Sequence, residues 1–156
     1  MTRARPAASK QQAAPALILA EPPASYRVHP PLVVDCSVLG ALLFEEPMRD
    51  EALRHLVGKS LHAPTLLDHE IASVAAKKQR QHWPADSIAM ALADYAQQDI
   101  RLHRADIAAQ VALAGRYGLS AYDAAYLWLA AELKAPLATF DIKLGRAAQQ
   151  HLGGIR

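Results

Sequence analysis

Four acidic residues interrupt apolar segments of this 156-residue chain. They lie in four separate contexts: Asp35 in PLVVDCSVLG, Glu70 in TLLDHEIASV, Asp123 in SAYDAAYLWLA and Asp141 in PLATFDIKLG. An ionised carboxylate costs several kcal/mol to remove from water unless it is paired or binds a metal. Four such intrusions indicate one shared site, so the fold must bring distant segments of the chain together.

Electrostatic repulsion limits how such a cluster can exist. Two carboxylates about 5 Å apart repel each other by roughly 3 kcal/mol at an effective dielectric constant of about 20. Several such pairs would rival the stability of a whole domain, about 5–15 kcal/mol. Some of the carboxylates must therefore hold protons, or a cation must lie among them. Because hard divalent cations prefer oxygen ligands, Mg²⁺ or Mn²⁺ is the leading candidate.

Length, charge and cysteine content exclude several classes of protein. The chain is long enough for one domain with a core and too short for two. A net charge of +2 excludes a polycation that binds nucleic acid by bulk charge, so any grip on RNA or DNA must come from a local patch. The single cysteine, Cys36, excludes an internal disulfide framework and a cysteine zinc cluster. With no apolar run near the roughly 20 residues of a membrane helix, we expect a cytoplasmic protein.

The chain divides into a tail and one domain. Residues 1–30 are rich in Pro and Ala and have no periodic apolar face, which is typical of a disordered or linker-like segment. Residues 31–156 form the predicted domain, in which short strands alternate with helices. Strands are predicted at 32–35, 60–63, 100–103 and 136–140, and helices at 37–44, 49–57, 64–80, 84–98, 106–117, 121–134 and from Asp141 onward. This alternation indicates an α/β fold with a mainly parallel sheet covered on both faces.

The acids are placed where such a fold puts its functional site. Ligands of open α/β sheets bind at the carboxyl ends of the strands. Asp35 ends a predicted strand, Asp141 directly follows one, and the helix that contains Glu70 also follows a strand. If the strands are parallel, at least three of the four acids reach the same edge of the sheet.

Each acid also has a simpler structural explanation. Asp141 could cap the last helix, since Asp is a favoured N-cap. Ser120 and Asp123 have the spacing of a capping box. Asp35 could be a turn residue beside Ser37, which is itself a plausible cap.

Glu70 is the hardest of the acids to explain as a structural residue. Thr65 and Asp68 already supply a predicted capping pair at the start of its helix, which leaves a surface position as its alternative. The one basic cluster lies at the end of the same predicted helix and just after it: Lys77, Lys78, Arg80 and His82. Cations commonly complement the dipole at a helix C-terminus, and phosphate binding is the functional alternative.

Three segments together resemble the PIN-domain ribonucleases, and most closely the VapC-type toxins of bacterial toxin–antitoxin pairs. VVDCSVLGALLFEEP is similar to the first motif of that family, with its acid at Asp35 and its hydroxyl at Ser37. HAPTLLDHEIASV is similar to the second motif and supplies Glu70. LSAYDAAYLWLAAELKAPLATFD is similar to the third and fourth motifs, with Asp123 and Asp141.

The resemblance implies a three-layer α/β/α fold with a short, mainly parallel sheet. It implies an Mg²⁺- or Mn²⁺-dependent endoribonuclease that acts on single-stranded or looped RNA, a homodimer, and an antitoxin that blocks the site. The implied catalytic and metal-binding residues are Asp35, Glu70, Asp123 and Asp141. Ser37 and Thr139 are possible auxiliary groups that could hydrogen-bond a phosphate or a water.

Two other functions are weighed against this one. A phosphatase of the haloacid-dehalogenase type would need a second Asp two residues after Asp35, where this chain has Ser37. A PIN-like module could instead bind RNA or a protein without cutting.

A further expectation concerns apolar residues that either pack in the core or form a groove for an amphipathic antitoxin segment. These residues are Leu39, Leu42, Leu43, Phe44, Leu53 and Leu56.

Overall fold

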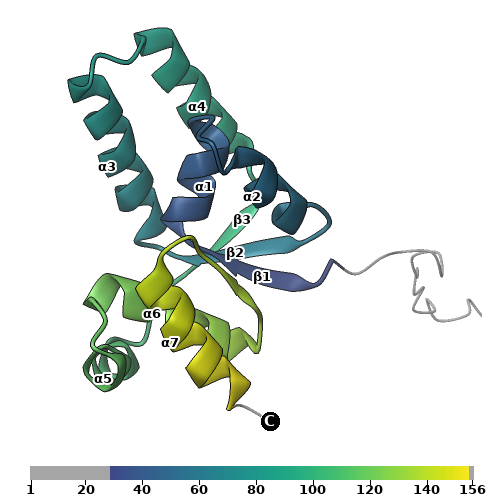
Figure 1. Cartoon of the computed structure of the whole chain (residues 1–156), viewed down its shortest axis with the longest axis vertical. Coiled ribbons are helices and arrows are strands. Elements are labelled where there is room, and N and C mark those ends of the chain that lie inside the picture. The colour runs from purple at the N-terminus through teal and green to yellow at the C-terminus, as the bar shows by residue number, and fades with distance from the viewer. Residues whose placement is uncertain (1–28, 155–156) are drawn as a thin grey trace, which may run out of the picture.

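The structure, a computed structural model, describes residues 29–154 as four strands and seven helices (Figure 1). In chain order these are β1 (Pro31–Val34), α1 (Cys36–Leu43), α2 (Arg49–Leu56), β2 (Ser60–Pro64), α3 (Leu67–Arg80), α4 (Ala85–Gln97), β3 (Ile100–His103), α5 (Ile107–Tyr117), α6 (Ala121–Leu133), β4 (Leu137–Ala138) and α7 (Ile142–Gly153). The predicted tail, residues 1–30, lies outside the described residues except for His29 and Pro30, which are exposed.

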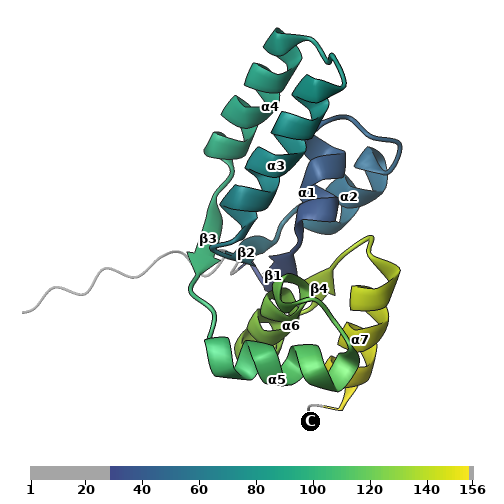
Figure 2. The same ribbon diagram turned by 90° about the vertical axis from the view of Figure 1, so that its left-hand side faces the viewer.

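The four strands form one parallel sheet in the order β3-β2-β1-β4. Helices α1 to α4 lie on one face of this sheet, and α5 to α7 lie on the other (Figures 1 and 2). The predicted three-layer α/β/α fold with a short parallel sheet is therefore confirmed. Within residues 29–154, none of the helices combines the length and the apolar character that a membrane span requires.

The core fills the space between the sheet and both helical layers. Val33 and Val34 on β1 are completely buried, as their β-branched side chains in a central strand predict. Helix α6 contacts β1, β2 and β4, and it is apolar on most of its surface for this reason. Leu127 and Leu129 of α6 have at most 1% of their surface exposed.

Strand β4 is two residues long, shorter than the predicted strand 136–140. The reason is that the next residues bind side chains of another segment. The Thr139 hydroxyl donates to Asp35, and the Phe140 amide donates to the Ser37 hydroxyl. These contacts turn the chain out of the sheet directly after β4.

Two predicted helix caps are wrong. The N-cap of α1 is Asp35, which accepts a hydrogen bond from the Val38 amide at 3.2 Å, and Ser37 lies inside the helix. Helix α3 begins at Leu67 without a side-chain cap, so Thr65 and Asp68 do not form a capping pair. Asp68 instead accepts a hydrogen bond from the Tyr95 hydroxyl at 2.7 Å.

A pair of histidines links β2 to the neighbouring edge strand, β3. His62 of β2 is buried, and its Nδ1 lies 2.9 Å from Nε2 of His103 on β3. The other ring nitrogen of His62 lies 3.2 Å from the Ser60 hydroxyl. Burial lowers the pKa of His62, and the nearby His103 and Arg101 lower it further.

This lowered pKa predicts a loss of stability in weak acid. As pH falls below about 6.5, His62 in the unfolded chain binds a proton while folded His62 stays neutral, so the free energy of unfolding decreases until the folded pKa is passed. Urea unfolding at about pH 7.5 and about pH 5.5 measures this loss, which should be smaller in His62→Gln than in wild type. His55→Gln, on the exposed face of α2, is the control. Equal losses in wild type and His62→Gln would contradict the role of this histidine.

Candidate active site

The four predicted acids are positioned by four different elements. Asp35 follows β1, and Glu70 lies in the first turn of α3, which follows β2. Asp123 lies in the first turn of α6, and Asp141 caps α7 after β4. Because β1, β2 and β4 are neighbouring parallel strands, three of the four acids follow strand ends on the same edge of the sheet.

Asp35 is the most enclosed of the four, with 6% of its surface exposed. One carboxylate oxygen accepts hydrogen bonds from the Ser37 hydroxyl at 2.7 Å and the Val38 amide at 3.2 Å, and the other accepts from the Thr139 hydroxyl at 2.6 Å. Burial nevertheless raises the pKa of Asp35, because its effect exceeds that of these hydrogen bonds. Both residues predicted as auxiliary groups, Ser37 and Thr139, therefore contact the first acid directly.

Glu70 is half-buried and lies within electrostatic reach of two other acids. Burial is the main cause that raises its pKa, and the charges of Asp35 and Asp123 raise it further. The hydroxyl of Tyr126 donates a hydrogen bond to Glu70 Oε2, which opposes part of this increase. Asp35, Glu70 and Asp123 thus form one group of interacting carboxylates.

Asp123 and Asp141 make the local contacts that their alternative explanations predict. The Ser120 hydroxyl accepts from the Asp123 amide at 3.0 Å and donates to the Asp123 carboxylate at 2.7 Å. Asp141 is exposed and accepts from the Leu144 amide at 2.7 Å, as a helix N-cap does. Its own amide donates to the Thr139 hydroxyl, which in turn donates to Asp35. Asp141 is linked to the buried acid through this hydroxyl.

The four acids offer the type of ligand that a hard cation prefers, but their side chains are not arranged around an ion in this structure. No group of three or more His, Cys, Asp or Glu side chains within residues 29–154 is placed to hold a metal ion. Each of the four carboxylates is instead bound to a hydroxyl or an amide of the protein. These neutral donors do not offset the cost of burying Asp35 and Glu70, and the charges of Asp35 and Asp123 still raise the pKa of Glu70. Carboxylate oxygens without a cationic partner are the kind of ligand that divalent cations such as Mg²⁺ bind.

Cys36 takes no part in this chemistry. Burial raises the pKa of its thiol to about 12, with contributions from the charges of Glu70, Asp35 and Glu46. The residue is therefore a thiol at neutral pH, and a thiol is neither a good nucleophile nor a good metal ligand.

Tyr126 is the residue that reasoning from the sequence missed. Its place in the apolar run of α6 predicts core packing, and only 2% of its surface is exposed. The available signal was its spacing of three residues from Asp123, which puts both side chains on one face of a helix. Its partner Glu70, on a different element, could not be identified from that spacing.

In the basic cluster at the end of α3, one cation is already paired with an acid. The Lys78 amine binds Glu46 at 3.0 Å and lies 4.2 Å from the centre of the Trp83 ring. Its charge is therefore already engaged by the protein.

Comparisons with known proteins agree with this architecture. The family model of the PIN domain matches residues 32–150. The crystal structure of PAE2754 from Pyrobaculum aerophilum is similar, with a TM-score of 0.58 and 20% sequence identity over 80% of this chain and 88% of that chain. At this level of identity the likeness concerns the fold alone. No curated protein matches the chain.

The raised pKa of Glu70 predicts that this carboxylate destabilises the metal-free protein. The contribution of the protonated Glu70 carboxyl to the free energy of unfolding is fully present below the unfolded pKa of about 4.5. It is lost as pH rises through the higher folded pKa, where the buried group ionises. At neutral pH without divalent metal, Glu70→Gln should therefore unfold at a higher urea concentration than wild type, since the amide oxygen can still accept from Tyr126. The difference should disappear near pH 4, roughly the range where the wild-type carboxylate is protonated. Glu132→Gln, on the exposed surface of α6, should show no such gain. A less stable Glu70→Gln would contradict this account of the site.

Proposed function

We propose that this chain, which belongs to the PIN-domain family, is a metal-dependent endoribonuclease that hydrolyses phosphodiester bonds in RNA. The PIN domain is a nuclease-type fold, and the observation that carries the proposal is that Asp35 and Glu70 follow neighbouring parallel strands, with the Glu70 carboxylate bound to Tyr126 on the helix that carries Asp123. We further propose that it is the toxin of a type II toxin–antitoxin pair, a homodimer and a cytoplasmic protein. These finer assignments follow from the likeness of its motifs to VapC-type toxins.

The acids would divide the catalytic work according to their burial. Asp35, Glu70 and Asp123 would hold one or two Mg²⁺ or Mn²⁺ ions, directly or through water. When bound, the ions would generate the nucleophile from water and neutralise charge that develops on the scissile phosphate. Asp141, on the exposed rim, would orient the attacking water or complete the ligand set. Ser37 and Thr139 hold the Asp35 carboxylate in place.

A second candidate is a PIN-like module that binds RNA or a protein without cutting it. It is favoured by one observation: within the described residues, the acids bind protein donors and are not gathered for an ion. Purified protein incubated with mixed RNA distinguishes the two, because only the nuclease produces cleavage that needs a divalent metal.

Removal of one charge from the site should abolish cleavage. We expect Asp35→Asn and Asp123→Asn to leave no detectable product from mixed RNA in Mg²⁺ or Mn²⁺, because each removes an ionised ligand. Asn is the better choice at position 35, since Ala at a helix N-cap costs about 0.5–2 kcal/mol and Asn preserves the cap. Asp86→Asn, on the exposed first turn of α4, is the control and should cleave like wild type. Equal cleavage by all four proteins, or activity with Zn²⁺ alone, would refute the assignment.

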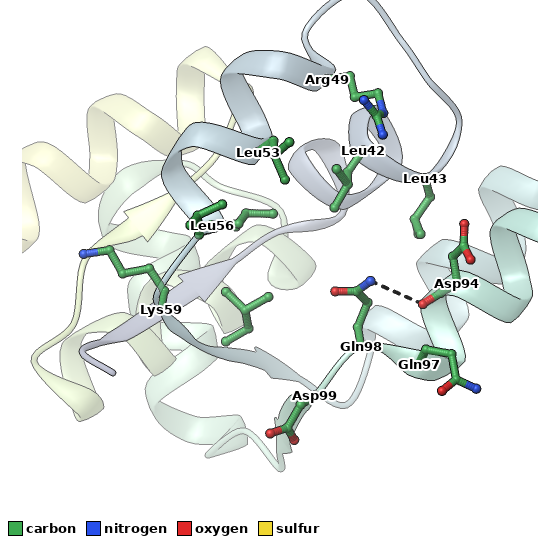
Figure 3. Close-up of a pocket in the computed structure, with 12 residues that line it drawn as sticks. Leu42, Leu43, Arg49, Leu53, Leu56, Lys59, Asp94, Gln97, Gln98 and Asp99 are labelled. Carbon is green, nitrogen blue, oxygen red and sulfur yellow. Dashed lines mark hydrogen bonds between the residues drawn. The ribbon is translucent and has the colours of Figure 1, made fainter. Parts of the chain in front are cut away.

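An apolar groove supports the antitoxin part of the proposal. A cavity of about 500 Å³ opens between α1, α2 and the end of α4 (Figure 3). Of the residues expected to form a groove, Leu42, Leu43, Leu53 and Leu56 line it, while Leu39 and Phe44 are buried in the core. Charged residues at its edge, Arg49, Lys59, Asp94 and Asp99, suit an amphipathic helix whose apolar face enters the groove.

The groove and the acids lie at opposite ends of α1. Leu42 and Leu43 end this helix at the groove, whereas Asp35 caps its other end. Eight helical residues span about 12 Å, so an antitoxin segment must continue beyond the groove before a basic side chain can reach the carboxylates. Binding of that basic side chain would compete with metal.

Leu53→Glu should weaken antitoxin binding and leave RNA cleavage intact. Leu53 is 41% exposed, so the added charge enters the groove and not the core. If a small gene lies directly upstream, its product is the partner to test by calorimetry, with Ile107→Glu on the opposite helical layer as the control. A titration with Mn²⁺ then examines the acids, because affinity should fall as Mn²⁺ rises. Affinity that ignores both Mn²⁺ and Asp35→Asn would place inhibition away from the acids.

A further inference from the structure

The contact between Glu70 and Tyr126 joins the two helical layers of the molecule. Glu70 lies on α3, on one face of the sheet, and Tyr126 lies on α6, on the other face (Figure 2). The two side chains are 56 positions apart in sequence and meet at the edge of the sheet where the acids lie. A bond between separate layers fixes their relative position as well as the orientation of one carboxylate.

Packing alone explains the ring of Tyr126 but not its hydroxyl. The ring is buried among apolar side chains of the core, where a phenylalanine would fill the same space. A buried phenol must have a hydrogen-bond partner, and this one is Glu70 Oε2. The hydroxyl is therefore the group whose role can be tested separately from the fold.

The same helix supplies an acid and the donor that orients another acid. Asp123 and Tyr126 are three residues apart on α6, so both side chains leave the same face of the helix. Because the Tyr126 hydroxyl binds Glu70, the face of α6 that carries Asp123 also faces Glu70. With Oε2 of Glu70 held by the phenol, the second oxygen, Oε1, remains the one to share with Asp35 and Asp123.

We propose that Tyr126 is a positioning residue, whose hydroxyl holds Glu70 so that one carboxylate oxygen joins Asp35 and Asp123 in binding a divalent cation. The inference rests on the proposed function in taking these three acids as the cation site. It assigns to a residue outside the four acids the task of setting metal affinity. Groups that orient metal ligands in this way typically change affinity or activity by about 10–100-fold when removed.

The test is Mn²⁺ binding to Tyr126→Phe, measured by calorimetry and by the paramagnetic resonance signal of free Mn²⁺. We expect the affinity to fall by about 10–100-fold while thermal unfolding remains cooperative, since Phe retains the ring and its packing. Tyr95→Phe is the matched control. It removes an equivalent bond from a tyrosine hydroxyl to a carboxylate, that of Asp68, outside the three acids. Its Mn²⁺ affinity should equal that of wild type.

The outcomes separate this inference from the proposed function. Wild-type Mn²⁺ affinity in Tyr126→Phe, or equal losses in both tyrosine variants, overturns the positioning role. A wild type that binds no Mn²⁺ overturns the positioning role and the metal dependence together. A wild type that binds Mn²⁺ and cleaves no RNA contradicts the nuclease, while a selective loss in Tyr126→Phe still supports the positioning role.

Discussion

The rest of the structure depends on how a buried carboxylate at the end of β1 is satisfied. Asp35 accepts hydrogen bonds from Ser37 and Val38 on its own helix and from Thr139 after β4. These bonds cap α1, end β4 after two residues and direct the chain into α7. A polar group without partners in this position would cost about 1–3 kcal/mol or more, so the three segments are held in a common arrangement.

Hydroxyl groups satisfy the geometry of the acids without cancelling their charge. Ser37, Thr139, Ser120 and Tyr126 each donate to one of the carboxylates. A neutral donor fills a lone pair, but the repulsion between neighbouring acids and the cost of their burial remain, as the raised pKa values of Asp35 and Glu70 show. The metal-free protein is therefore folded around a site that favours either protons or a cation.

Much of the fold could be predicted because its signals are local. Runs such as LVV and IRLH between helical stretches marked all four strands, and the β-α alternation predicted a parallel sheet. The strand order could not be predicted, since pairing of β1 with both β2 and β4 is a contact between distant segments. The length of β4 was overestimated for the same reason: Phe140 continues the apolar run, but its amide binds Ser37.

At the site, too, contacts between residues close in sequence could be predicted, whereas contacts between distant residues could not. Local patterns placed Asp123 in a capping box with Ser120 and Asp141 at a helix N-cap, and both contacts are present. The cap of α1 was assigned to Ser37 because a hydroxyl and a carboxylate lie within reach of the same helix start. The contact of Ser37 with Phe140, 103 residues away, decides between them. The predicted grouping of acids depended on parallel strands, which a single sequence indicates only through its alternation of elements. The catalytic roles of the acids remain predictions.

The hydrogen bond between Thr139 and Asp35 joins residues far apart in the sequence, and this has a consequence for biosynthesis. This hydroxyl meets a carboxylate 104 residues earlier in the chain, so the two parts can join only after every element between them has been made. Loops of such length close late, because their entropic cost must be met by contacts already formed. As synthesis proceeds from the N-terminus, β1 to α6 leave the ribosome with Asp35 still lacking this partner. The nascent chain therefore carries Asp35, Glu70 and Asp123 before it carries their final geometry, and completion of the site coincides with the last stage of folding.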